Sequence, residues 1–238
     1  MKKLNFNINE LGQTAVGMVN IPGETGDGSA IRVTNHVLDD CIKAGIANGK
    51  KVVCASGRGT KNIYYDFGDK ILVKLSAEDD EVAVFDKEIA GESLSDIFEG
   101  KSMCLNRNTE AGRGIWRMSY PRVRHYKQKR DENGNRVAVV DTNYSISVSI
   151  ILWLLYTGAI TKEDLHSKNG KIIDITEYEA HHYKADWDNR VDATVMMTTT
   201  AHTEYHTENG QYSHQVIVNP TYVDEVVALL DYVDNYTI

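Results

Sequence analysis

Residues 179 to 210 read EAHHYKADWDNRVDATVMMTTTAHTEYHTENG and contain four of the eight histidines of the chain. Two of them, His181 and His182, are adjacent, and the other two, His202 and His206, are four residues apart. Residues four apart on a helix lie on one face, with Cβ atoms about 5 to 6 Å from each other. Imidazole is a common metal ligand and titrates near neutral pH. The cluster therefore indicates metal binding or proton transfer.

The residues around these histidines predict a strand, a loop, a second strand and a helix, in that order. The run KIIDITEY at 171 to 178 is rich in isoleucine and reads as a strand that leads into the histidine pair. Residues 195 to 198 are apolar and β-branched enough for a short second strand. One of the threonines at 198 to 200 can cap a helix, which Asn209 and Gly210 would end. This helix would carry the second histidine pair.

This arrangement resembles the HNH family of endonucleases, whose ββα-metal motif has the same order of elements. The histidine spacing is similar to the colicin-like branch, and the upstream hairpin and apolar helix are similar to phage-type and homing-type members. The resemblance covers about residues 115 to 210. It implies that His181, His202 and His206 bind one divalent metal ion (Zn, Mg, Mn or Ni) and that His182 is the general base. The implied reaction is hydrolysis of DNA phosphodiester bonds to 5′-phosphate and 3′-hydroxyl ends.

One position departs from the family pattern. The family's asparagine, which hydrogen-bonds across the loop and holds the strand of the base, falls at Ala193, nine residues before His202. Asn189 or Asp192 can supply that contact instead, or the site is weakened or inactivated. Asn189 is therefore a candidate catalytic residue, and Arg190 in the same loop is a candidate for binding the phosphate.

The adjacent histidines pose a geometric problem. If His181 and His182 are both extended, their side chains point to opposite faces of the strand, so a distortion at the strand end must bring both to one phosphate. Ala193 cannot make the family's hydrogen bond to support such a distortion. We therefore expect slow cleavage, and an Ala193→Asn substitution is expected to raise the rate by about 10-fold or more.

A basic stretch precedes the histidine cluster. Residues 106 to 136 hold nine basic and three acidic side chains, a local charge of +6 in a chain whose net charge is −8. The acidic total argues mildly against nucleic acid as a partner, whereas the local excess, with Trp116 and Tyr126 interleaved, favours a DNA-contacting strip. A solvated hairpin face is the equal alternative. The candidate DNA contacts, called the basic strip below, are Arg113, Arg117, Arg122, Arg124, Lys127, Lys129 and Arg130.

The composition is that of an α+β globular protein. Its 238 residues are 42% hydrophobic and 25% charged. The three cysteines form no CxxC pattern, which favours a reducing compartment, and we expect a cytoplasmic protein of a bacterial or phage-infected cell. The basic start has no apolar segment after it, and the longest apolar run, residues 146 to 156, is shorter than the about 20 residues that span a bilayer. We therefore expect no membrane partner.

The first of two expected domains, residues 1 to 105, reads as a mixed α+β unit of unknown role. A helix is expected in residues 33 to 50, with Asn48 and Gly49 as its end. The runs KKVVCAS, KNIYYDF and DKILVKLS then predict short strands, and a helix is possible near residues 93 to 99.

The second expected domain, residues 106 to 238, reads as the HNH-like unit. It begins with a hairpin whose tight turn is expected at Asn133 and Gly134. An apolar helix ending at Gly158 and a capping box at Thr161 follow. A last helix is expected to begin near Pro220.

Two functions of different classes fit these observations. In the first, the protein is a metal-dependent DNA endonuclease with DNA as its partner. In the second, the site is degenerate, and the protein binds nucleic acid or another protein around a structural metal. Ala193 and the acidic net charge favour the second function.

Overall fold

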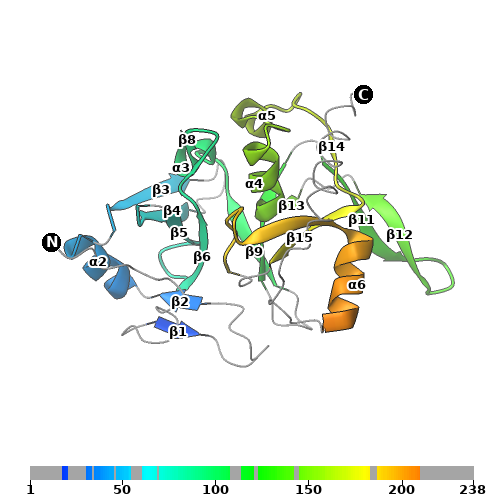
Figure 1. The fold of residues 1–238 in the computed structure, drawn as a ribbon, viewed down its shortest axis with the longest axis horizontal. Coiled ribbons are helices and arrows are strands. Elements are labelled where there is room, and N and C mark those ends of the chain that lie inside the picture. The colour runs from blue at the N-terminus through cyan, green and yellow to red at the C-terminus, as the bar shows by residue number, and fades with distance from the viewer. Residues whose placement is uncertain are drawn as a thin grey trace.

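The computed structural model describes residues 18–20, 31–33, 35–45, 47–54, 61–68, 70–107, 114–120, 123–141, 145–182 and 187–209 (Figure 1). The expected helix at Pro220, and Arg113 and Arg122 of the basic strip, lie outside these residues. Helices and strands are both present, which confirms the α+β class. In the described part of the chain, no helix is long and apolar enough to cross a membrane.

The amino-terminal part forms an antiparallel sheet of six strands, in the order β1-β2-β6-β5-β4-β3. The strands are β1 Met18–Asn20, β2 Ile31–Val33, β3 Lys50–Cys54, β4 Lys61–Asp66, β5 Lys70–Lys74 and β6 Glu81–Asp86. The expected strands correspond to β3, β4 and β5. Sequence reasoning overlooked β6, whose residues 81 to 85 are all buried and therefore do not alternate between polar and apolar.

The sheet is covered on both faces. Val82 and Val84 of β6 belong to a cluster with Leu38 of helix α2 (Asn35–Lys43), whereas Ala83 and Phe85 point into the larger core. Helix α2 was expected to continue to Asn48 and Gly49. It ends earlier because Gly45 adopts a left-handed conformation (φ 70°) that closes the last turn.

The larger core joins the two expected domains. Residue 105, the expected boundary, lies inside β9 (Met103–Arg107), which pairs with β10 (Gly114–Ser119). Phe85 and Trp116, on opposite sides of that boundary, pack edge to face with ring centroids 5.9 Å apart. The same cluster of buried side chains also contains helix α4 (Val148–Tyr156). The two parts of the chain therefore share one core.

Several short elements surround this core. They are β7 Glu88–Ile89, β8 Glu92–Ser93, α3 Leu94–Ile97, β13 Ser145–Ser147, α5 Lys162–His166 and β14 Ile173–Asp174. The apolar helix ending before Gly158 is confirmed as α4, although its first expected residues form β13. The capping box of α5 is also confirmed, since Thr161 and Asp164 bond to each other's backbone N–H.

The hairpin of β11 (Val123–Arg130) and β12 (Arg136–Asp141) is present, but its turn differs from the expected one. The last pair of the ladder is Arg130 with Arg136, so residues 131 to 135 form the connection. Only Gly134 among them has a positive φ, of 82°. The Asp131 carboxylate accepts the N–H groups of Asn133 and Asn135, and this local bonding replaces the tight two-residue turn.

Candidate metal centre

The histidine cluster lies on a strand pair and the helix that follows it. Strand β15 (Tyr178–His182) pairs antiparallel with β16 (Thr194–Thr198), and α6 (Thr199–Asn209) begins directly afterwards. Thr198 Oγ1 accepts the N–H of Ala201 at 3.1 Å, so Thr198 caps α6. The expected order of two strands and a helix is confirmed.

The first strand is shorter than KIIDITEY suggested. The Asp174 side chain accepts the N–H of Thr176 at 3.0 Å, and the Tyr178 N–H bonds to the Ile175 carbonyl at 3.2 Å. This turn separates β14 from β15, because an aspartate side chain competes with a strand neighbour for the backbone N–H. Because of this turn, β15 begins at Tyr178 and ends with the histidine pair.

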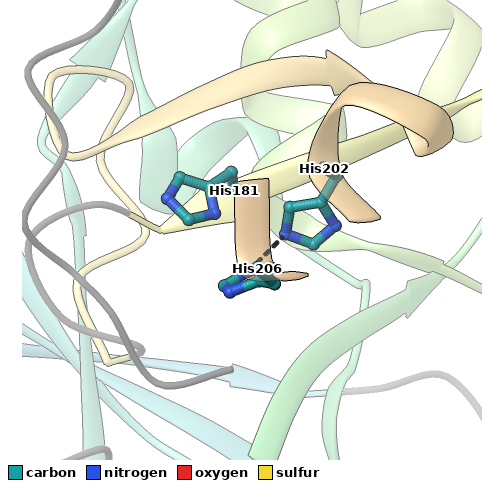
Figure 2. A group of neighbouring side chains, drawn as sticks. All are labelled: His181, His202 and His206. Carbon is teal, nitrogen blue, oxygen red and sulfur yellow. Dashed lines mark hydrogen bonds between the residues drawn. The ribbon is translucent and has the colours of Figure 1, made fainter. Parts of the chain in front are cut away.

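Three histidines converge (Figure 2). His181 on β15 and His202 and His206 on α6 each offer one nitrogen, and these nitrogens lie within 4.8 Å of one another, so the three side chains could hold a metal ion. His181 is buried, with 2% of its surface exposed, and the other two are half-buried. The structure thus brings together the three residues that were predicted as metal ligands. They are called the triad below.

A carboxylate that sequence reasoning missed orients the triad. Glu179 Oε2 lies 2.5 Å from His202 Nδ1, and His202 Nε2 lies 3.0 Å from His206 Nε2. A carboxylate accepts a proton, so it favours the imidazole with hydrogen on Nδ1 and the lone pair on Nε2. The signal was available, because Glu179 and His181 are two apart in a strand and therefore share a face.

His182 faces away from the triad. Its Nε2 lies 3.2 Å from Ser149 Oγ on α4 and 3.2 Å from Asn189 Oδ1 in the loop before β16. The pairing of β15 with β16 stays regular through His182 and Thr194. The distortion that was expected to bring both histidines to one side is therefore absent from the described part of the strand. Alternation along β15 separates the two side chains.

Asn189 makes the cross-loop contact. Its Oδ1 also accepts the Ser149 hydroxyl at 2.8 Å, and its Nδ2 donates to the Trp187 carbonyl at 3.3 Å. This orientation presents an acceptor oxygen to His182 Nε2, which favours the imidazole tautomer with hydrogen on Nε2. Asn189, one of the two residues expected to replace the missing asparagine, is the one in contact with His182, and its role in catalysis stays a prediction. The Asp192 side chain is 63% exposed.

Arg190 is engaged within the loop. Its Nε and Nη2 donate to the two carboxylate oxygens of Asp188 at 2.9 and 2.7 Å. Asp188 is 1% exposed, and the hydrogen bonds to its carboxylate, reinforced by its charge, raise the pKa of the Arg190 guanidinium above the ordinary value. This ion pair competes with the phosphate contact predicted for Arg190, which stays a prediction.

Members of the basic strip differ in their surroundings. Arg117 on β10 is partly buried and donates to the Ser145 hydroxyl and carbonyl at 3.0 and 2.6 Å, and burial lowers the pKa of its guanidinium. Lys129 and Arg130 are exposed at the end of β11, where Arg130 also donates to the Gly134 carbonyl at 2.7 Å. Arg124 and Lys127 lie earlier on the same strand.

No protein-family model, curated protein or solved structure matches this chain.

Proposed function

We propose that this protein is a divalent-metal-dependent DNA endonuclease of the HNH type. The observation that carries the proposal is the convergence of His181, His202 and His206 from a strand and the following helix. The base candidate His182 is adjacent to His181 in sequence and lies on the opposite face of β15. Two strands and a helix that hold the ligands, as in the ββα-metal arrangement, support it. The resemblance in histidine spacing, which concerns the same three residues, is consistent with it.

The donor set fits a metal that prefers nitrogen ligands. Imidazoles suit zinc or nickel, whereas magnesium prefers oxygen ligands. Two nitrogens bound to one tetrahedral zinc lie about 3.3 Å apart, given Zn–N bonds of about 2.0 to 2.1 Å. The 3.0 Å between His202 Nε2 and His206 Nε2 is close to that separation. A divalent ion held there would stabilise the negative charge that grows on the phosphate during hydrolysis.

The residues of the chain supply the remaining parts of the reaction. His182, whose Nε2 contacts Asn189 and Ser149, is the candidate to accept a proton from water. Glu179 keeps the lone pair of His202 on Nε2. Lys129 and Arg130, which are exposed at the end of β11, are candidates to contact DNA phosphates.

A plasmid-nicking assay tests the proposal. The purified protein is incubated with Zn²⁺, Ni²⁺, Mn²⁺ or Mg²⁺ in turn, beside His182→Ala and a matched His36→Ala control. His36 is exposed on α2 and contacts only Asp40 among the described ion pairs. We expect cleavage by the wild type and by His36→Ala, and none by His182→Ala. Cleavage retained by His182→Ala would point to a contaminating nuclease.

A second function is favoured by one observation, the placement of His182 on the face of β15 opposite the triad. In this alternative the triad binds a structural metal, His182 packs against α4, and the domain binds nucleic acid or a protein without cutting. Stoichiometric metal binding with no nicking under any of the four ions would favour this second function.

A further inference from the structure

The loop before β16 is attached to the amino-terminal sheet. Among the residues that the structure describes, strand β2 pairs with β6 at Glu81 and Val82, and the loop before β16 bonds to β6 farther along the strand. The Val84 N–H donates to the Trp187 carbonyl at 2.9 Å, and the Asn189 N–H donates to the Val84 carbonyl at 2.8 Å. These two bonds form a parallel bridge between β6 and the loop.

Two side chains extend this attachment. Trp187 is 8% exposed and belongs to the cluster that contains Leu38 and Val84, so the start of the loop is anchored against the sheet. Asp86, at the end of β6, accepts the N–H of Val191 through Oδ2 at 3.0 Å. Asn189 therefore lies between two points that are both fixed to β6.

The far end of the loop is held from the other side. Thr194 Oγ1 donates to the Arg190 carbonyl at 3.0 Å and accepts the indole N–H of Trp153 on α4 at 3.0 Å. Helix α4 also supplies Ser149, which bonds to Asn189. The loop is thus clamped between β6 and α4, and the Asn189 amide projects from this clamp toward His182.

We propose that Asp86 is a positioning residue for His182: by holding the Val191 N–H it fixes the loop, and through Asn189 it fixes the ring orientation and tautomer of His182. The inference rests on the proposed function only for the role of His182 as base. It assigns a task to the amino-terminal sheet, whose edge holds the loop that carries Asn189.

The length of the contact between His182 and Asn189 explains why the hydrogen bond from Val191 to Asp86 matters. The contact between His182 Nε2 and Asn189 Oδ1 is 3.2 Å, at the long end of the range for an N–H···O bond. A small shift of the loop would break it, and a misplacement of about 1 Å at a reacting group can cost on the order of 10²-fold in rate. Asp86→Ala removes the acceptor for Val191, whereas Asp86→Asn keeps an acceptor oxygen of the same reach.

The tautomer of His182 can be read directly in the full-length protein. Side-chain ¹⁵N NMR of the metal-free protein, recorded at one pH above about 6.5 so that histidine is mainly neutral, distinguishes hydrogen on Nε2 from hydrogen on Nδ1. His182→Gln assigns the signal. We expect the Nε2–H form in the wild type and in Asp86→Asn, and a mixture of tautomers in Asp86→Ala. An unchanged signal in Asp86→Ala overturns the proposal.

Hydrogen exchange on the wild type covers the case in which Asp86→Ala does not fold. The amides of Val84, Asn189 and Val191 belong to one clamp, so we expect them to be protected to a similar degree. Rapid exchange of Val191, at the rate of an exposed loop, while Val84 and Asn189 remain protected, overturns the role of Asp86.

Cleavage assays separate this inference from the proposed function. We expect Asp86→Ala to lower the nicking rate by about 10-fold or more and Asp86→Asn to stay within a few fold of the wild type. A protein that cuts DNA while His182 keeps its tautomer in Asp86→Ala contradicts the positioning role alone. A tautomer that responds to Asp86→Ala in a protein that never cuts contradicts the nuclease assignment alone.

Discussion

The two faces of β15 are stabilised in different ways. On the triad face, His202 and His206 are half-buried, and the carboxylate that orients them, Glu179, is 50% exposed. On the other face, His182 contacts Ser149 and Asn189, which are 0% and 2% exposed. Two of the three candidate ligands are therefore less enclosed than the residues around His182, whereas the third, His181, is 2% exposed. The His182 face is fixed by packing before any ion binds.

The largest expected effect is a difference in metal affinity between variants on the two faces of β15. Replacing His181 with alanine removes a ligand, so metal affinity should fall by more than about 100-fold, beyond the loss typical of outer contacts. His182→Ala should leave affinity within a few fold while abolishing cleavage. Titration calorimetry with Zn²⁺ measures both variants. Equal losses of affinity would mean that the two histidines share one face, and the contrast between the faces of β15 would be wrong.

The next effect concerns Asp86, which belongs to the clamp behind the His182 face. Burial raises the pKa of its carboxyl from the ordinary 3.8 to about 6, opposed by the Val191 N–H and the Arg190 charge and reinforced by Asp192. The folded protein then binds more protons than the unfolded chain between these two values. Stability from this group is therefore present at low pH and is lost as pH rises through about 6.

Asp86→Asn isolates that contribution. The difference between the two pKa values, 3.8 and about 6, corresponds to about 3 kcal/mol of unfolding free energy. As the pH rises from about 4 to about 7, the wild type should lose this amount of stability, whereas Asp86→Asn should not. Urea unfolding of both proteins across this range gives the measurement. A constant difference between them would show that the Asp86 carboxyl titrates alike in the folded and unfolded states.

The structure changes the expectation for Ala193→Asn. Ala193 is 0% exposed, and Asn189 already makes the contact with His182. The larger side chain would overpack the site, so we expect a loss of about 1 to 3 kcal/mol in stability and no gain in cleavage. Thermal unfolding and the nicking assay test both statements. A faster enzyme of unchanged stability would mean that Asn189 does not hold the base.

The smallest expected effect is the loss of metal affinity when Glu179 on the triad face is replaced. Glu179→Ala should lower metal affinity by about 10-fold, because outer carboxylates that orient metal-binding histidines typically contribute 10- to 100-fold and this one is half exposed. The matched control is Glu177→Ala, an exposed carboxylate in the same segment. Equal affinities for the two variants would leave Glu179 without a role in the site.

Local signals in the sequence predicted the local structure of the site. A threonine cap among residues 198 to 200 and the capping box at Thr161 follow from residues close in sequence, and the shared face of His202 and His206 follows from helical spacing. Such signals depend on backbone geometry within one helical turn or one strand, so they can be recognised before the tertiary structure is known. The addition of His181 to the pair of His202 and His206 came from the resemblance to the HNH family.

Contacts between distant segments could not be predicted in this way. The Ser149 hydroxyl bonds to Asn189, 40 residues away, and no periodic pattern links the two positions. Strand β6 was missed because burial on both faces removed its alternation. Asp131 and Gly45 altered the hairpin turn and the end of α2, since one local hydrogen bond or one left-handed residue can outweigh the stronger pattern nearby.

The attachment of the loop to β6 limits how this site can be inherited. The hydrogen bond from Val191 to Asp86 spans 105 positions of the chain. A gene fragment that encoded only the strand pair and α6 would carry the three ligands but would leave behind the edge that aligns the loop. Recombination into a new protein would therefore transfer the three candidate ligands more readily than the alignment of His182.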